Sequence, residues 1–377
     1  MKIAFFTFNA YDMLTGGKGG VVGGAQIQQI LIGQELAERG HTIYFVERNS
    51  REKSMREIEG VQVRLIPNRC DGSAPMKALQ RSIDTVQILR ELDIDVAYTR
   101  VPVFEVIPLA TFCSISRTKF VYGFAHDSEL TDDPVIFETK FTDNAVYKKA
   151  MKTALKSAEV LISQNDFQYQ EAKRQFDTVV EKIPNGYPIP ENPSEQKLSG
   201  IEAPVVLWVS TLRPWKQPEI VFELADELPE TMFVIVGGRA DEAPTLADEI
   251  TAGAEARPNV RYEGFVPYED IDDYYTASDI FLNTSTNEGF PNTFLEAWSH
   301  RTPVVSLSVN PSNVLTNNEI GYVADGSVEK LRDRLGSLVS DPEKRVRFGE
   351  AAFEYFRSNH SIEHVTTKYE RVLTGGR

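Results

Sequence analysis

The chain has 377 residues, of which 41% are hydrophobic and 25% are charged, and its formal net charge is −15. This length exceeds one ordinary hydrophobic core and predicts about two domains. The acidic balance argues against a nucleic-acid-binding protein, which needs a basic surface to neutralise phosphates. The two cysteines, Cys70 and Cys113, lack metal-ligand spacing and are typical of core thiols in a reducing compartment.

The N-terminus does not have the pattern of a signal peptide, because the short apolar run Ile3–Phe8 ends in Asn9 without a small-residue cleavage site. An apolar run of about 18 residues, as a membrane span requires, is also missing. We therefore expect a cytoplasmic protein. The charge is uneven, since residues 1–190 hold 23 Lys and Arg against 24 Asp and Glu. This near-neutral half leaves open a peripheral contact with an anionic membrane, although lysines 148, 149, 152 and 156 fit a solvated helix face more simply.

The first half of the chain alternates strands and helices. A strand over Lys2–Phe8 is followed by the glycine-rich loop Thr15–Gln26, a helix that ends near Gly40, and a strand over His41–Val46. This order is typical of a βαβ unit and predicts a parallel sheet. Further strands are expected at Val61–Ile66, Val96–Thr99, Lys119–Phe124 and Val160–Ser163. We therefore expect a Rossmann-like domain over residues 1–190.

A second series of the same kind follows a proline-rich linker that begins near Pro184. The expected strands are Val205–Val209, Met232–Val236, Val260–Tyr262, Ile280–Asn283 and Pro303–Leu307. They predict a second Rossmann-like domain over residues 201–355. Two such domains would place the carboxyl ends of both sheets around one cleft. The aromatic spacing in the final segment, Ala351–Leu373, predicts one helix.

Two loops have the composition of anion-binding sites. The first is not a P-loop, because Gly17-Lys18 is followed by glycine and not by Ser or Thr. Gly23 and Gly24 still let backbone N–H groups approach an anion at a helix N-terminus; the alternative is a tight turn without a ligand. The second loop, Ser210–Lys216, offers Arg213 and Lys216 for phosphate oxygens, unless both are solvated surface cations.

A pair of glutamates follows the strand Ile280–Asn283. Pro291 is suited to a helix start, which places Glu288 in a loop and Glu296 on the helix, so that both can line one pocket. The backbone N–H groups of residues 289–293 then form a helix N-terminus that suits a diphosphate. Carboxylates beside such a site are useful if they accept hydrogen bonds from sugar and ribose hydroxyls.

The pattern Glu288-x₇-Glu296 within Glu-Gly-Phe-Pro-Asn resembles the donor-site motif of family-4 retaining glycosyltransferases of the GT-B fold. The resemblance covers nearly the whole chain. Several further segments follow in the family's order: Gly23-Gly24, Arg39-Gly40-His41, Pro184-Asn185-Gly186, Lys216, Gly264-Phe265-Val266 and Thr302-Pro303-Val304. The resemblance implies an α/β GT-B fold with an N-terminal acceptor domain (1–190) and a C-terminal donor domain (201–355). It also implies a final helix (356–377) that packs back on the first domain.

The same resemblance implies roles for single residues. Glu296 is expected to hold ribose hydroxyls, Glu288 a sugar hydroxyl, and Lys216 the diphosphate. His126 corresponds to a histidine that contacts the sugar near the reacting carbon, whereas a lone histidine is more often structural. Arg213 only partly replaces the arginine that the family often has two residues earlier. The other expected donor contacts are Gly23, Gly24, Val266, Gly289, Phe290, Asn292 and Thr293.

The implied reaction moves a hexose from a UDP- or GDP-sugar to a hydroxyl of a glycan or lipid-linked acceptor, with retention and without a metal or other cofactor. Asp93-Ile-Asp95 has the spacing of a metal-binding DxD but fits a turn that leads into a strand. Two alternatives remain: a sugar-nucleotide epimerase or hydrolase of the same fold, and a non-catalytic nucleotide-sugar-binding subunit. The complete set of Lys216, Glu288, Glu296 and His126 argues against the last.

Overall fold

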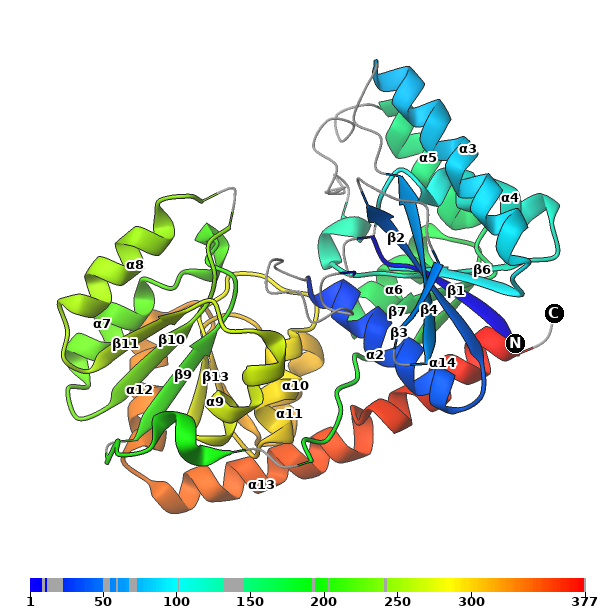
Figure 1. Ribbon diagram of the computed structural model, residues 1–377. Coiled ribbons are helices and arrows are strands. Elements are labelled where there is room, and N and C mark those ends of the chain that lie inside the picture. Colours follow the sequence, from blue (N-terminus) through cyan, green and yellow to red (C-terminus); the bar gives the residue numbers. More distant parts are fainter. Residues whose placement is uncertain are drawn as a thin grey trace. The chain divides into compact units, whose positions relative to one another are not determined.

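The chain folds into two compact units, as the computed structural model in Figure 1 shows. The first unit comprises Met1–Gly186 and Ile362–Arg377, and the second comprises Tyr187–Ser361. The structure describes residues 1–8, 11, 23–49, 55–58, 60–67, 73–100, 102–131, 145–191, 194–202, 204–240 and 243–375. The chain therefore enters the second unit once and returns to the first for its last helix.

The first unit is built on an eight-stranded sheet with the order β3-β4-β2-β1-β5-β6-β7-β8. All neighbours are parallel except β3 and β4. The central strands are apolar and buried along their whole length, as expected for a parallel sheet covered on both faces. The strands are β1 (Lys2–Phe6), β2 (Thr42–Asn49), β3 (Met55–Ile58), β4 (Val61–Pro67), β5 (Val96–Thr99), β6 (Lys119–Gly123), β7 (Val160–Ser163) and β8 (Val179–Lys182).

The direction of chain progress through this sheet reverses at β1. The chain first moves outward from β1 to β2 and β4, and then returns to the other side of β1 with β5. Ligands of open α/β sheets bind at the carboxyl ends of the strands at such a switch point. The helices of this unit are α2 (Gly24–Glu38), α3 (Ala74–Leu92), α4 (Val106–Ile115), η1 (Asp127–Leu130), α5 (Ala145–Lys156), α6 (Asp166–Gln175) and α14 (Ile362–Thr374).

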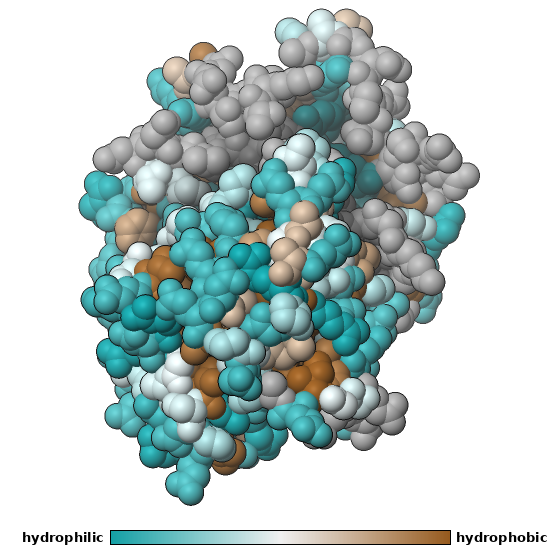
Figure 2. All heavy atoms as spheres, turned by 90° about the vertical axis from the view of Figure 1, so that its left-hand side faces the viewer, coloured by the Kyte–Doolittle hydropathy of each residue, from teal (hydrophilic) through white to brown (hydrophobic). Residues whose placement is uncertain are grey.

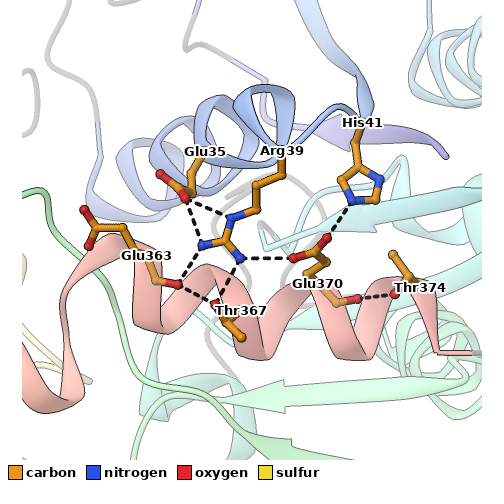
Figure 3. A network of polar contacts seen from close by, with 7 residues as sticks. All are labelled: Glu35, Arg39, His41, Glu363, Thr367, Glu370 and Thr374. Carbon is orange, nitrogen blue, oxygen red and sulfur yellow. Dashed lines mark hydrogen bonds and ion pairs between the residues drawn. The ribbon is translucent and has the colours of Figure 1, made fainter.

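The last helix, α14, is fastened to α2 by the polar network that Figure 3 shows. Arg39 Nη1 donates to Glu370 Oε2 at 3.0 Å, and Arg39 Nη2 donates to the carbonyl of Glu363 at 2.8 Å. His41 Nε2 lies 3.0 Å from the other oxygen of Glu370. Apolar residues of α14, among them Val365 and Tyr369, are buried in the same core as β1 and β5. The helix is therefore an integral part of the first unit.

The second unit has a six-stranded parallel sheet with the order β11-β10-β9-β12-β13-β14. Its switch point lies between β9 and β12. The strands are β9 (Val205–Val209), β10 (Met232–Val236), β11 (Val260–Gly264), β12 (Ile280–Asn283), β13 (Val304–Ser306) and β14 (Gly321–Val323). The helices are η2 (Glu195–Leu198), η3 (Pro214–Lys216), α7 (Ile220–Glu227), α8 (Leu246–Glu255), η4 (Tyr268–Asp270), α9 (Asp272–Thr276), α10 (Asn292–Ser299), η5 (Pro311–Asn313), α11 (Val314–Asn317), α12 (Val328–Val339) and α13 (Pro342–Asn359).

The predicted α/β class with two Rossmann-like domains is confirmed. The expected strands all form, with ends that shift by at most three residues. The prediction of one final helix over Ala351–Leu373 is wrong, because α13 ends at Asn359 and α14 begins at Ile362. The break lets the carbonyl of His360 accept a hydrogen bond from the backbone N–H of Tyr187 at 2.9 Å.

Two surface properties bear on the function. Among the described residues, none of the helices is both long and apolar enough to cross a membrane. Figure 2 shows a face on which hydrophilic residues predominate and hydrophobic ones are scattered, as the high charge content leads us to expect.

Candidate active site

The predicted donor residues converge on the switch point of the second sheet. The loop after β9 carries Arg213 and Lys216, and the loop after β12 carries Glu288. Lys216 Nζ lies 2.9 Å from Glu288 Oε2, and the two side chains are only 16% and 17% exposed. Two oppositely charged groups that are far apart in sequence therefore meet where ligands of such sheets bind.

Polar groups at the end of β12 hold Glu288 in its charged form. Asn283 Nδ2 donates to Glu288 Oε1 at 3.1 Å, and the Ser285 hydroxyl also hydrogen-bonds the carboxylate. Burial alone would raise the pKa of Glu288, but Lys216 and these hydrogen bonds together lower the pKa below its usual value. At neutral pH the site thus presents an ionised carboxylate paired with Lys216.

A hydrogen-bonded chain joins the two loops. Trp208 Nε1 donates to Thr284 Oγ1 at 2.8 Å, and Thr284 Oγ1 donates to the carbonyl of Lys216 at 2.6 Å. The backbone N–H of Thr286 donates to the carbonyl of Trp215 at 3.0 Å. Because Trp208 and Thr284 are buried, these bonds fix the loop that carries Lys216 against the loop that leads to Glu288.

The second glutamate, Glu296, lies on α10 and is 5% exposed. Tyr275 Oη donates to Glu296 Oε2 at 2.8 Å. Burial raises the pKa of Glu296 to about 7. The hydrogen bond from Tyr275 lowers this pKa, whereas the charge of Asp272 raises it further. The carboxyl therefore titrates near neutral pH, in contrast to Glu288.

Buried aromatic and polar residues surround this carboxyl. His300 stacks on the ring of Tyr275, with ring centroids 5.7 Å apart, and its Nδ1 lies 2.7 Å from the carbonyl of Glu296. Burial lowers the pKa of His300 against the opposing effects of that carbonyl and of Asp272. Tyr187 Oη donates to Asp272 Oδ1 at 2.8 Å. Glu296 thus belongs to a cluster that links α9, α10 and the start of the second unit.

The remaining predicted donor residues of the second unit lie at or near the same sheet edge, with different exposures. Arg213 is partly buried, and its guanidinium lies 5.1 Å from the ring centre of Trp215. Val266 follows β11 and is partly buried. Phe290 is buried, with its ring 5.0 Å from that of His360, so its side chain packs in the interior. Gly289 is also buried, whereas Asn292 and Thr293 are partly exposed at the start of α10.

The first unit carries the predicted residues His126, Gly23 and Gly24. His126 is exposed after β6, and its backbone N–H donates to Glu129 Oε1 at 2.9 Å. Gly23 and Gly24 are exposed at the N-terminus of α2, where the carbonyl of Gly23 accepts from the backbone of Gln26. Residues 15–22 of the glycine-rich loop and Cys70 lie outside the described residues.

The DxD-like pair lies at the edge of the first sheet where the strands begin, opposite the edge that carries His126. Asp95 Oδ2 accepts a hydrogen bond from the backbone N–H of Lys2 at 2.8 Å, and Asp93 ends α3 with a left-handed backbone. In the described part of the chain, no three His, Cys, Asp or Glu side chains are grouped so that they could hold a metal ion.

Residues 191–355 match the family described as glycosyl transferases group 1. The C-terminal unit belongs to this family. The matched region contains Lys216, Glu288 and Glu296, so the ion pair at the switch point is a feature of a group 1 glycosyl transferase domain. The resemblance inferred from the Glu288-x₇-Glu296 pattern is thereby confirmed.

The relatives of this group 1 domain are glycosyltransferases by name. The chain is 32% identical over 172 residues to the D-inositol 3-phosphate glycosyltransferase of Corynebacterium efficiens, which is 42% of this chain and 40% of that protein. It is 28% identical over 176 residues to the lipopolysaccharide core biosynthesis glycosyltransferase LpsE of Rhizobium meliloti, which is 46% of this chain and 50% of that protein. The matches therefore span half or less of these relatives.

Solved structures resemble the whole chain and establish the GT-B fold. Sucrose-phosphate synthase from Thermosynechococcus elongatus superposes with a TM-score of 0.81 at 15% identity, over 99% of this chain and 98% of that chain. Anabaena Alr3699/HepE in complex with UDP superposes with a TM-score of 0.76 at 18% identity, over all of both chains.

Sequence reasoning missed the residues that support the two glutamates of the group 1 domain. Asn283 ends β12 and is followed by Thr284 and Ser285. All three are buried, and their polar side chains at the end of an apolar strand were the available signal. Tyr275 and Tyr187 carried no such signal, because both reach the Glu296 cluster only through tertiary packing.

Proposed function

We propose that this protein is a retaining glycosyltransferase that moves a sugar from a nucleoside-diphosphate sugar to a hydroxyl of a glycan or lipid-linked acceptor. The observation that carries the proposal is the Lys216–Glu288 pair at the switch point of a group 1 glycosyl transferase domain. The ammonium group is suited to the diphosphate, and the carboxylate is suited to a sugar hydroxyl. Known structures of Anabaena Alr3699/HepE hold UDP or UDP-glucose, which supports a UDP-sugar as the first donor to test.

In the proposed reaction, the bond between the anomeric carbon and the diphosphate oxygen breaks, and a bond from that carbon to the acceptor oxygen forms on the same face. The acceptor proton passes to the departing diphosphate. Negative charge develops on the leaving group, where Lys216 and the N-terminus of α10 stabilise it. His126 of the first unit contacts the sugar near the reacting carbon. The set needs neither a metal ion nor another cofactor.

Glu296 has a separate role in this proposal, which is to accept hydrogen bonds from the ribose hydroxyls. Its buried position favours such a role, because a ribose that displaces the Tyr275 hydroxyl satisfies an acceptor that is shielded from water. The charged carboxylate is the better acceptor. Nucleotide binding is therefore expected to tighten as the pH rises through about 7, the pKa of Glu296 in the free protein.

Calorimetric titration of UDP, GDP and ADP, and of their sugar conjugates, tests the donor assignment. We expect selective binding of one diphosphate and about ten- to a hundredfold weaker binding by Glu296→Ala, as for the loss of hydrogen bonds to a charged group. Glu263→Ala, also in the second unit but paired with Tyr274 and Arg261, is the matched control that should leave the affinity unchanged. Conversion of a free donor into an isomer would instead indicate an epimerase.

We also propose a peripheral contact between the first unit and an anionic membrane surface. Three apolar residues of α3 are strongly exposed: Met76, Leu79 and Ile83, at 66%, 63% and 49%. They recur at helical spacing and form one stripe. Helix α4 packs against both α3 and α5, and α5 exposes lysines at positions 149, 152 and 156. An apolar stripe near lysines complements a membrane with anionic lipids.

Co-sedimentation with vesicles tests this contact. Binding is expected to vesicles that contain phosphatidylglycerol and to be weak with pure phosphatidylcholine. A Leu79→Ser, Ile83→Ser double variant should release the protein from the first kind of vesicle. Val346→Ser, which changes an equally exposed apolar residue of the second unit, should not. Equal binding of both variants to the anionic vesicles would contradict the assignment.

A further inference from the structure

The side chain of Arg100 is buried with most of its hydrogen bonds unmade. It is 2% exposed, and its Nη2 donates to Asn185 Oδ1 at 2.6 Å. The other two nitrogens, Nε and Nη1, are buried and have no hydrogen-bond partner in the described part of the chain. Buried charges in proteins are normally paired, and buried donors are normally satisfied. Among the residues that the structure describes, none forms an ion pair with this side chain.

The nearby carboxylate of Glu129 does not fill this role. Its Oε1 accepts from the backbone N–H groups of Ala125 and His126 at 2.7 and 2.9 Å, and its Oε2 accepts from Tyr122 Oη at 2.6 Å. The charge of Arg100 lowers the pKa of Glu129, but no hydrogen bond or ion pair joins the two side chains. Glu129 is thus committed to the loop that carries His126.

Arg100 stands at the position where the first sheet is expected to bind a ligand. It directly follows β5, and β5 and β1 form the switch point of this sheet. The equivalent position in the second sheet is the site with Lys216 and Glu288. Each unit therefore places a partly or fully buried cation at the carboxyl edge of its sheet, beside its switch point.

Neighbouring residues hold the arginine in place. A Cβ atom at Gly123 would be in ordinary contact with Arg100 Cγ, at 3.4 Å, but would clash with Tyr98 Oη, at 2.6 Å, so the glycine leaves space for the Tyr98 hydroxyl. Asn185 is itself buried, in the segment next to Gly186, whose backbone exchanges two hydrogen bonds with Gln28. A guanidinium held by one neutral amide keeps its charge available to a ligand.

We propose that Arg100 binds an oxyanion, phosphate or carboxylate, that the acceptor carries. This inference rests on the proposed function, because that function gives the first unit the acceptor. Arg100 is then a specificity-determining residue: acceptors with an anionic group next to the reacting hydroxyl bind, and neutral ones do not. The guanidinium is suited to such groups because it is always charged and offers several N–H donors in one plane.

Calorimetric titration of the full chain tests the site with inorganic phosphate and with acetate, each in the presence and absence of the best-binding nucleotide. We expect one anion site that the nucleotide does not block. Arg100→Met should weaken binding at this site about ten- to a hundredfold. Lys216→Met should keep the site and lose nucleotide affinity. Arg64→Met, which removes another arginine of the first unit that is paired with Glu91, should leave the site intact.

Asn185→Asp is a second variant that does not depend on the folding of Arg100→Met. It places a carboxylate within reach of the guanidinium, so the melting temperature should rise while anion binding at this site is lost. Glycerol 3-phosphate and vesicles with phosphatidylglycerol then separate a soluble phosphate ester from a lipid head group. Binding of any of these probes that Arg100→Met removes supports the proposal and gives the source of the anion.

Two outcomes would overturn it. The first is that Arg100→Met binds the anions as the wild type does. The second is that the wild type has no anion site in addition to its nucleotide site. Either would mean that the two nitrogens are merely hydrated in the free protein. Failure of every nucleotide to bind would contradict the proposed function instead. The phosphate titrations of the wild type and of Arg100→Met would still test the anion site in that case.

Discussion

Removing both charges of the Lys216–Glu288 pair together is expected to destabilise the protein by less than the sum of the two single changes. At 2.9 Å and an effective dielectric constant of about 20, the attraction is about 6 kcal/mol before desolvation. Desolvation offsets most of it, since the side chains are only 16% and 17% exposed. We expect Lys216→Met and Glu288→Gln each to lower the free energy of unfolding by about 2–3 kcal/mol, because each leaves one charge buried without its partner. The coupling in the double variant should be about 1–3 kcal/mol.

Urea denaturation of the wild type, the two single variants and the double variant at pH 7 measures these free energies of unfolding. The pH dependence gives an independent check on the sign. In the wild type the pKa of Glu288 is lowered by folding, so its stabilising contribution is present above the unfolded pKa and is lost as the pH falls through the folded pKa. In Lys216→Met burial dominates and raises the pKa, so stability should instead decrease as the pH rises through the acidic range. Additivity of the two single variants within about 0.5 kcal/mol would refute the pairing argument.

Three further predictions concern residues around this site and the last helix. The folded pKa of Glu296, about 7, exceeds its ordinary value of 4.5, so stability should fall as the pH rises between these values, and Glu296→Gln should remove that part of the pH dependence in urea titrations. Gly237→Ala would bring a Cβ to 2.1 Å from the carbonyl of Ser210, so it should lower the melting temperature and weaken nucleotide binding; Gly336→Ala, in an open helical position, should stabilise by about 0.5–1 kcal/mol. Arg39→Met should increase the amide hydrogen exchange rate of α14 more than that of the other elements. An equal change in all elements would contradict the view that the contacts in Figure 3 hold α14 on α2.

The sequence predicts the sheets well because their central strands are short runs of buried apolar residues. It misses strands that lack this property. Strand β3 (Met55–Ile58) is mostly exposed and pairs antiparallel at the edge. Strand β8 (Val179–Lys182) is a partly exposed edge strand, and β14 (Gly321–Val323) has only three residues. Apolar runs identify a strand only where both faces are covered.

The candidate site is predictable to a similar degree. Positions after β9 and β12 identify Lys216 and Glu288 as neighbours, because parallel strands that are adjacent at a switch point bring their carboxyl ends together. The surroundings of Glu296 are not predictable in this way, since Tyr275 and Tyr187 approach from separate elements. The same holds for Arg100, whose unmade hydrogen bonds become visible only in the folded structure. The roles assigned to His126, Arg213 and Val266 stay predictions.

A retaining transferase is tested most directly by the release of nucleoside diphosphate from the selected nucleotide sugar, with the anomeric configuration of the first-formed product followed by NMR. We expect slow release without an acceptor, a product that keeps the configuration of the donor, and a loss of about 10²–10³ in rate for Lys216→Met. Unchanged release by Lys216→Met, or a product of inverted configuration, would contradict the proposed function.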